Sequence, residues 1–209
     1  MKREPPDALP PAVLPAELLR AISREELNAL PVCRWDGAVH VIASPDAVDR
    51  AIDDIGGERV LGFDTETRPA FRVGESYLPS LVQLATSTAV YLFQVQQVDC
   101  AAALRAVMAN ASIVKAGVSV ADDLKKLKEV FPFDHDGVVD LGRVAKRHGL
   151  NQTGVRNLVG LFLGSRVTKG AQTTNWAAPR LTPQQISYAA TDAWACRELY
   201  LRFEGLGLL

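Results

Sequence analysis

Two carboxylates separated by one residue stand directly after an apolar run. The run Val60–Phe63 is predicted to be a buried strand, and Asp64 and Glu66 follow it. Side chains two positions apart on a strand point to the same face, so the two carboxylates are expected side by side. At about 4 Å they repel by about 4 kcal/mol at an effective dielectric near 20, and burial adds to that cost. A bound cation would offset the repulsion; the ordinary alternative is a solvated strand end or a helix-capping Asp.

A second acidic pair, Asp122 and Asp123, begins a predicted helix. An acid at a helix start can cap free backbone N–H groups and suits the helix dipole, which explains one of the two but not both. Lys125, Lys126 and Lys128 follow on the same helix. They could offset the carboxylates or contact phosphates, or they could form an ordinary solvated helix face.

The third group lies on a helix predicted from Pro183 to Phe203. Residues four apart share a helix face, so the Tyr188 hydroxyl and the Asp192 carboxylate point in one direction. Taken alone, this pair also fits a packed aromatic ring beside a surface acid.

The elements that must position these groups alternate along the chain. Apolar runs predict strands at 39–42, 60–63, 81–85, 90–93, 113–117 and 138–140. Helical patterns occupy 45–55, 100–108, 122–131, the region around 144, 155–162 and 183–203. The runs 81–85 and 90–93 form a predicted hairpin beside the central strand. This order predicts an α/β domain with a mixed central β-sheet flanked by α-helices.

The first 31 residues differ from the rest, because they hold half of the twelve prolines. Proline fixes φ and lacks a backbone donor, so residues 1–31 are predicted to be a loosely docked proline-rich tail. Ser23 and Glu26 have capping-box spacing, which predicts one short helix within it. Residues 32–209 form the predicted domain.

Composition limits the classes of protein that the chain can be. Its 209 residues, 48% hydrophobic and 22% charged, suit a soluble globular domain, and no apolar run is long enough to span a membrane. The start has no signal-peptide pattern, and we expect a cytoplasmic location. A formal net charge of -1 requires any nucleic-acid contact to be local and partly metal-mediated. Three cysteines without a CxxC pair argue against disulfides and zinc: Cys33, Cys100 and Cys196.

The order of these groups resembles the DEDDy group of 3'-5' exonucleases in the ribonuclease H-like superfamily, which includes ribonuclease D, the Werner helicase exonuclease domain and polymerase proofreading domains. The resemblance covers about residues 32–203, with motifs at 61–66, 116–127 and 188–193. Asn175-Trp176 and the segment 74–76 are also similar. It implies a ribonuclease H-like fold. Similar sequences place the acid directly before Leu-x-x-Leu, which selects Asp123, and Ser187 at the place of a histidine indicates the tyrosine subgroup.

The resemblance also implies a mechanism with two Mg²⁺ or Mn²⁺ ions. Asp64 would bridge both ions, Glu66 and Asp192 would complete one site, and Asp123 would support the other. Oxygen-only ligands favour such hard cations over zinc. Tyr188 would orient the attacking water rather than act as a base, because the pKa of a free tyrosine is about 10.

The implied substrate is the 3' end of DNA or RNA, from which mononucleotides are released. The backbone at Thr65 would meet the terminal sugar, and Arg166, Lys169 and Arg180 could hold phosphates, although they could equally be surface charge. Two other functions fit the same fold. One is an oligoribonucleotidase for very short RNAs; the other is a catalytically inactive nucleic-acid-binding module, which would be expected to have lost at least one acid.

Overall fold

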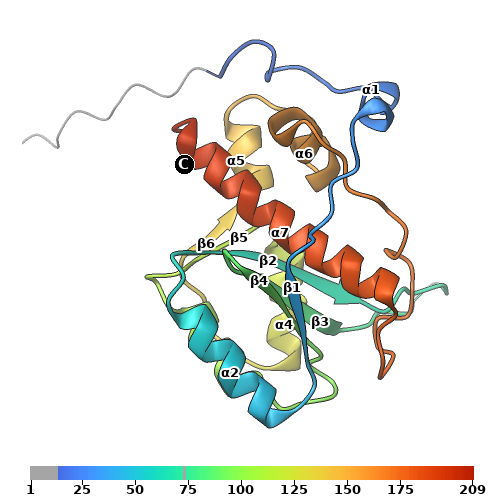
Figure 1. The fold of residues 1–209 in the computed structure, drawn as a ribbon, viewed down its shortest axis with the longest axis vertical. Helices are drawn as coiled ribbons and strands as arrows, with labels where there is room; N and C mark the ends of the chain where they lie inside the picture. The colour runs from blue at the N-terminus through green and yellow to red at the C-terminus, as the bar shows by residue number, and fades with distance from the viewer. Residues whose placement is uncertain (1–13, 73) are drawn as a thin grey trace, which may run out of the picture.

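A six-stranded mixed sheet forms the centre of the protein (Figure 1). The computed structural model describes residues 14–72 and 74–209. The strand order is β1-β4-β3-β2-β5-β6, and of these strands only β3 runs against its neighbours. The strands are β1 (Ala38–Ile42), β2 (Val60–Thr67), β3 (Pro79–Ala85), β4 (Ala89–Phe93), β5 (Val114–Gly117) and β6 (Val138–Asp140).

Helices cover both faces of the sheet, because each face is apolar. They are α1 (Arg24–Ala29), α2 (Pro45–Gly56), α3 (Ala101–Ala109), α4 (Ala121–Val130), α5 (Leu141–Arg147), α6 (Val155–Leu163) and α7 (Pro183–Gly205). Side chains of α2, α3 and α4 pack with Leu61 and Phe63 on one face. Those of α5, α6 and α7 pack with Val60 and Ala116 on the other, where α7 crosses the sheet (Figure 1). The predicted α/β layers and the β3–β4 hairpin are confirmed.

Helix α7 lies directly on the backbone of β2. It begins with Pro183 at its first position, after a capping box between Thr182 and Gln185. A Cβ atom added to Gly62 would overlap the carbonyl oxygen of Ala193. Glycine at this position of β2 therefore allows the helix to approach the strand closely.

Strand β2 is longer than its apolar run predicts. Asp64 pairs with Gln83 and Glu66 pairs with Leu81 on β3, and the register shifts only between Glu66 and Thr67. The two acids therefore lie at the end of the strand, as expected, although the apolar run stops at Phe63. Pairing with the wholly buried β3 overrides the weak strand preference of Asp and Glu.

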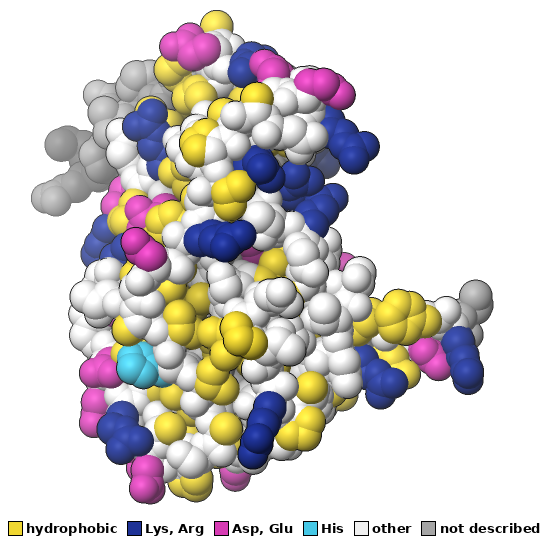
Figure 2. Space-filling model, turned by 45° about the vertical axis from the view of Figure 1, so that its right-hand side comes forward, with side chains coloured by type: hydrophobic (Ala, Val, Ile, Leu, Met, Phe, Trp, Pro, Cys, Tyr) yellow, Lys and Arg dark blue, Asp and Glu magenta, His cyan; other side chains and the backbone are white. Residues whose placement is uncertain are grey.

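The connection between β2 and β3 projects from the body of the domain (Figure 2). It carries Phe71, whose side chain is 81% exposed, and Arg68, whose guanidinium lies 4.9 Å from the centroid of the Tyr77 ring. An exposed aromatic side chain therefore follows the strand that carries the acids.

The short helix predicted near the N-terminus is present as α1. Ser23 caps it, and the Glu26 side chain completes the capping box. Leu14, Ile22 and Leu27 are buried, so the described part of this segment packs on the domain. The division at residue 31 stays a prediction, and Pro5, Pro6, Pro10 and Pro11 lie outside the described residues. In the described part of the chain, no helix is both long and apolar enough to cross a membrane.

Candidate active site

Strand β2 and helix α7 bring three carboxylates together. Ligand oxygens of Asp64, Glu66 and Asp192 all lie within 4.8 Å of one another. Glu66 and Asp192 are buried, and Asp64 is partly buried. The close approach of α7 at Gly62 carries Asp192, one residue before Ala193, to the acids of β2. We call these three residues the acid cluster.

The fourth predicted acid, Asp123, lies beside this cluster on α4. Its Oδ1 accepts a hydrogen bond of 2.6 Å from the Thr65 hydroxyl, whereas Asp122 is exposed. The N-cap of α4 is Val120, and no side chain caps the helix there. Both acids lie in the first turn, where the helix dipole favours them, and Asp123 in addition faces β2, where Thr65 holds its carboxylate.

Mutual repulsion and burial perturb the titration of these acids. Burial, followed by the charges of Asp192 and Asp123, raises the pKa of Asp64 well above its ordinary value. Burial and the same kind of repulsion, chiefly from Asp64, raise the pKa of Glu66 to about 10. Burial raises the pKa of Asp192 to about 7. Each shift reports a carboxylate whose charge is not compensated by a nearby cationic side chain.

This donor set fits divalent cations. In the described part of the chain, no Lys or Arg forms a salt bridge with the four acids. Burial raises the pKa of Asp123, and the hydrogen bond from Thr65 and the charge of Lys126 offset this only in part. Buried carboxylate oxygens without a basic partner match the ligand preference of hard cations such as Mg²⁺ or Mn²⁺.

Tyr188 lies one helical turn before Asp192, as its spacing predicts. Burial and the charges of Asp192 and Glu66 raise the pKa of its phenol far above the ordinary value. The hydroxyl therefore stays protonated and can hold a water molecule without acting as a base. The ring packs against Trp176, with ring centroids 6.0 Å apart, and Trp176 is 1% exposed. Gln185 fixes this contact by donating to the Asn175 carbonyl at 3.2 Å.

The predicted nucleic-acid contacts are less closely grouped. The Arg166 Nε donates to the Leu30 carbonyl at 3.1 Å, which gives this side chain a structural role. Lys169 and Arg180 are exposed on the connection between α6 and α7. Thr65 is buried on β2, directly between the first two acids. The assignment of these four residues to substrate binding stays a prediction.

Sequence reasoning assigned no role to two residues that shape the site, Gly62 and Trp176. Gly62 was an available signal, since glycine inside an apolar strand often marks a close backbone approach. Trp176 stood out only through the family resemblance, and no local pattern indicates that its ring supports Tyr188.

The mixed sheet and its buried acids define a domain of the ribonuclease H-like fold with a candidate metal site. A family model described as 3'-5' exonuclease matches residues 39–206, so the chain belongs to this 3'-5' exonuclease family. The chain is 28% identical over 189 residues to the "Exonuclease mut-7 homolog" of Aedes aegypti. It is 32% identical over 154 residues to "Bifunctional 3'-5' exonuclease/ATP-dependent helicase WRN" of Mus musculus.

These relatives are much longer proteins. The matches cover 78% and 71% of this chain but only 26% and 11% of the two relatives. Among solved structures, the Aedes aegypti Nibbler EXO domain superposes with a TM-score of 0.73 at 26% identity, covering 85% of this chain and 92% of that one. Escherichia coli RNase D shares the fold, with a TM-score of 0.72 at 23% identity, over 82% of this chain and 46% of that one.

Proposed function

We propose that this chain is an active 3'-5' exonuclease that hydrolyses phosphodiester bonds from the 3' end of DNA or RNA. The observation that carries the proposal is the acid cluster, whose ligand oxygens lie within 4.8 Å of one another. The four acids and the tyrosine expected of an active DEDDy exonuclease are all present, which favours an enzyme over an inactive binding module. The exonuclease activities for which the mut-7 homolog and WRN are named support the same reaction.

Two Mg²⁺ or Mn²⁺ ions are proposed to bind at the acids. The acid cluster would hold one ion, and Asp64 together with Asp123 would hold the second. When bound, such ions stabilise negative charge that develops on the attacking and leaving oxygens of a phosphodiester. The hydrogen bond from Thr65 restrains the Asp123 carboxylate, so this ligand is already oriented toward β2.

The protein groups around the acids have separate proposed tasks. The Tyr188 hydroxyl orients the attacking water, and Trp176 keeps the phenol ring in place. The backbone of Thr65 meets the terminal sugar. The exposed ring of Phe71 is available to stack on a base near the 3' end, because every base offers a π face. Lys169 and Arg180 are the proposed phosphate contacts, with Arg166 contributing from a more restrained position.

A comparison of linear and circular strands tests this function. A 5'-labelled linear oligonucleotide should be shortened from its 3' end only when Mg²⁺ or Mn²⁺ is supplied, and a chelator should stop the reaction. A 3' phosphate should slow cleavage strongly, because it adds charge where the terminal sugar must bind. Equal cleavage of a closed circle would identify an endonuclease and refute the proposal.

The cellular location is a separate proposal. Cys33, Cys100 and Cys196 are free thiols, which is typical of a reducing compartment, and we propose the cytoplasm. Cell fractionation with an antibody to the protein tests it, and recovery in an extracellular or periplasmic fraction would contradict it.

A further inference from the structure

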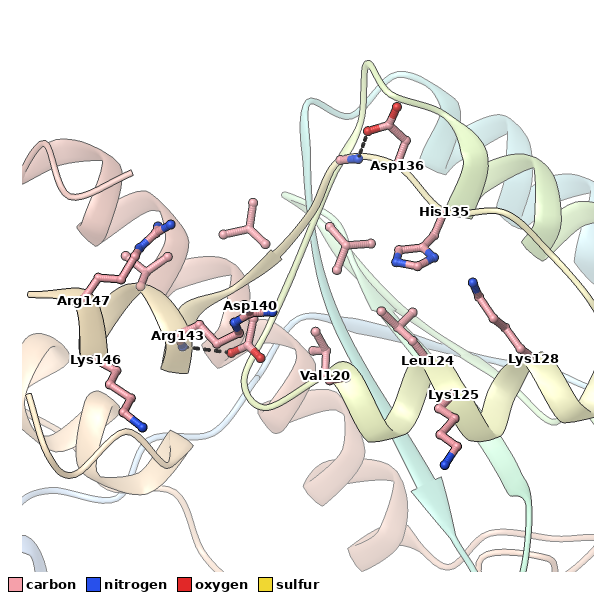
Figure 3. A pocket seen from close by; sticks show the side chains of 15 residues that line it. Val120, Leu124, Lys125, Lys128, His135, Asp136, Asp140, Arg143, Lys146 and Arg147 are labelled. Carbon is pink, nitrogen blue, oxygen red and sulfur yellow. Dashed lines mark hydrogen bonds between the residues drawn. The ribbon is translucent and has the colours of Figure 1, made fainter. Parts of the chain in front are cut away.

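A large groove runs along the sheet edge at β6, and no residue of the acid cluster lines it (Figure 3). Its volume is about 1250 Å³. Helix α4 lines one side and helix α5 the other, with β6 and the residues before it between them. We call it the β6-edge groove. The cationic side chains that line it, together with one histidine, are Lys125, Lys128, His135, Arg143, Lys146 and Arg147.

The positive charge of the β6-edge groove is not neutralised by its own acids. Asp136 Oδ1 accepts from the Gly137 amide at 2.6 Å. Asp140 Oδ1 accepts from the amides of Ser119 at 3.1 Å and Arg143 at 3.2 Å. Within the described residues, none of the five Lys and Arg side chains forms a salt bridge. The groove thus presents five cations without a salt-bridge partner, although Lys128 lies 5.4 Å from the centroid of the Phe133 ring, and two acids that are engaged in holding the backbone.

The space between these cations is apolar. Val120, Leu124, Val138, Val139 and Val144 also line the groove. A nucleic-acid strand matches both features. Its phosphates can contact the cationic sides of the groove, and its bases or sugars can cover the aliphatic floor. An acidic peptide would match the charge but offers no flat, repeated apolar group to cover the floor.

We propose that the β6-edge groove binds the phosphodiester backbone of nucleic acid outside the active site. Helix α4 connects the two regions, since Asp123 contacts Thr65 on one side while Lys125 and Lys128 line the groove on another. A side-chain-clad helix is only about 10–12 Å across, so a strand whose 3' end lies at the acids can pass α4 and enter the groove. This continuity rests on the proposed exonuclease function. The charge of the groove does not.

The test is a charge reversal in α5, far in sequence from the acids. Arg143→Glu combined with Lys146→Glu is compared with a control of equal net charge, Arg24→Glu combined with Arg105→Glu, at exposed positions outside the groove. With a single-stranded oligonucleotide of about 20 residues, the groove variant should raise KM roughly tenfold and reduce the salt dependence of binding. With a trinucleotide, KM and kcat should equal those of the wild-type protein. The control should change KM less than about twofold on either substrate.

The possible outcomes separate the groove from the catalytic proposal. If the wild-type protein hydrolyses neither substrate, the exonuclease function fails, and fluorescence anisotropy with the long oligonucleotide still tests the groove. The proposal is overturned if the groove variant and the control bind that oligonucleotide equally. It is also overturned if the variant loses affinity for polyglutamate but not for the oligonucleotide, which would indicate an acidic protein partner. Circular dichroism checks that the groove variant is folded. If it is not, the neutral variant Arg143→Gln with Lys146→Gln is used instead, with Arg24→Gln combined with Arg105→Gln as its control.

Discussion

The acid cluster and the β6-edge groove are both groups of like charges, but only the acid cluster is buried. Water screens the exposed cations of the groove from one another, so their repulsion costs little. The carboxylates at Asp64, Glu66 and Asp192 lack that screening, and their pKa values rise because burial and repulsion disfavour the charged forms. The buried acid cluster is therefore stable only when a proton or a cation neutralises it, whereas the exposed groove is stable without a bound partner.

The largest effect should come from removing one acid of the cluster. Asp64→Asn and Asp192→Asn should each reduce kcat by about 1000-fold or more, because a lost metal ligand removes several kcal/mol of transition-state stabilisation. The metal-free variants should be at least as stable as the wild-type protein, since a repelling charge is gone. Single-turnover kinetics and thermal unfolding measure both. Near-wild-type turnover in either variant would show that the site is misassigned.

Substitutions of Asp122 and Asp123 on α4 test which of these two acids belongs to the active site. Asp123→Ala should reduce kcat by about 100-fold, corresponding to about 2.7 kcal/mol. Asp122→Ala should change it less than about twofold, because consecutive helix residues point about 100° apart and Asp122 is exposed. The same steady-state assay checks both, and the reverse pattern would transfer the metal ligand to Asp122.

The stability of the metal-free protein should depend on pH in the direction set by the acid cluster. Burial raises the pKa of Asp192 from 3.8 to about 7, and burial with repulsion from Asp64 raises that of Glu66 from 4.5 to about 10. The folded state therefore binds more protons than the unfolded state, and stability falls as pH rises through this range. From pH 5 to 8 in a chelator, Tm should drop by roughly 5 °C.

Added Mg²⁺ or Mn²⁺ should restore more of this Tm at pH 8 than at pH 5, because cations compete with protons for the carboxylates. Asp64→Asn should flatten the slope and supplies the control. A metal-free Tm that rises with pH from 5 to 8 would contradict the described electrostatics.

The smallest effect on catalysis is expected at Tyr188. Tyr188→Phe should lower kcat about tenfold and leave KM within about twofold, because the ring still packs on Trp176 while the hydroxyl is lost. Parallel measurement of kcat and KM on one oligonucleotide checks this. A change confined to KM would instead make Tyr188 a substrate-binding residue.

Much of the fold follows from local patterns in the sequence. Apolar runs locate the strands, and the capping signals at Ser23 and Thr182 locate the starts of two helices. The end of β2 is the main exception, since Asp64 and Glu66 are poor strand formers that pairing with β3 holds in the ladder. Local pattern cannot supply that pairing, because it depends on a neighbour distant in sequence.

The candidate site was predictable in its residues but not in its arrangement. Family resemblance indicated the four acids and Tyr188, whereas the hydrogen bond from Thr65 to Asp123 depends on how α4 docks against β2. The β6-edge groove was even harder to predict from the sequence. Lys125 and Lys128 are visible as a charge run, but their proximity to Lys146 exists only once α4 and α5 flank β6.

The docking of α7 on Gly62 has a consequence for how the protein is made. Asp64 lies in the first third of the chain and Asp192 in the last third, and their proximity depends on that late helix. Contacts of large sequence separation form slowly, and chain segments leave the ribosome from the N-terminus onward. A growing chain therefore contains β2 and α4 without a complete acid cluster. The chain therefore cannot assemble the cluster until α7 has been synthesised and has packed onto the sheet.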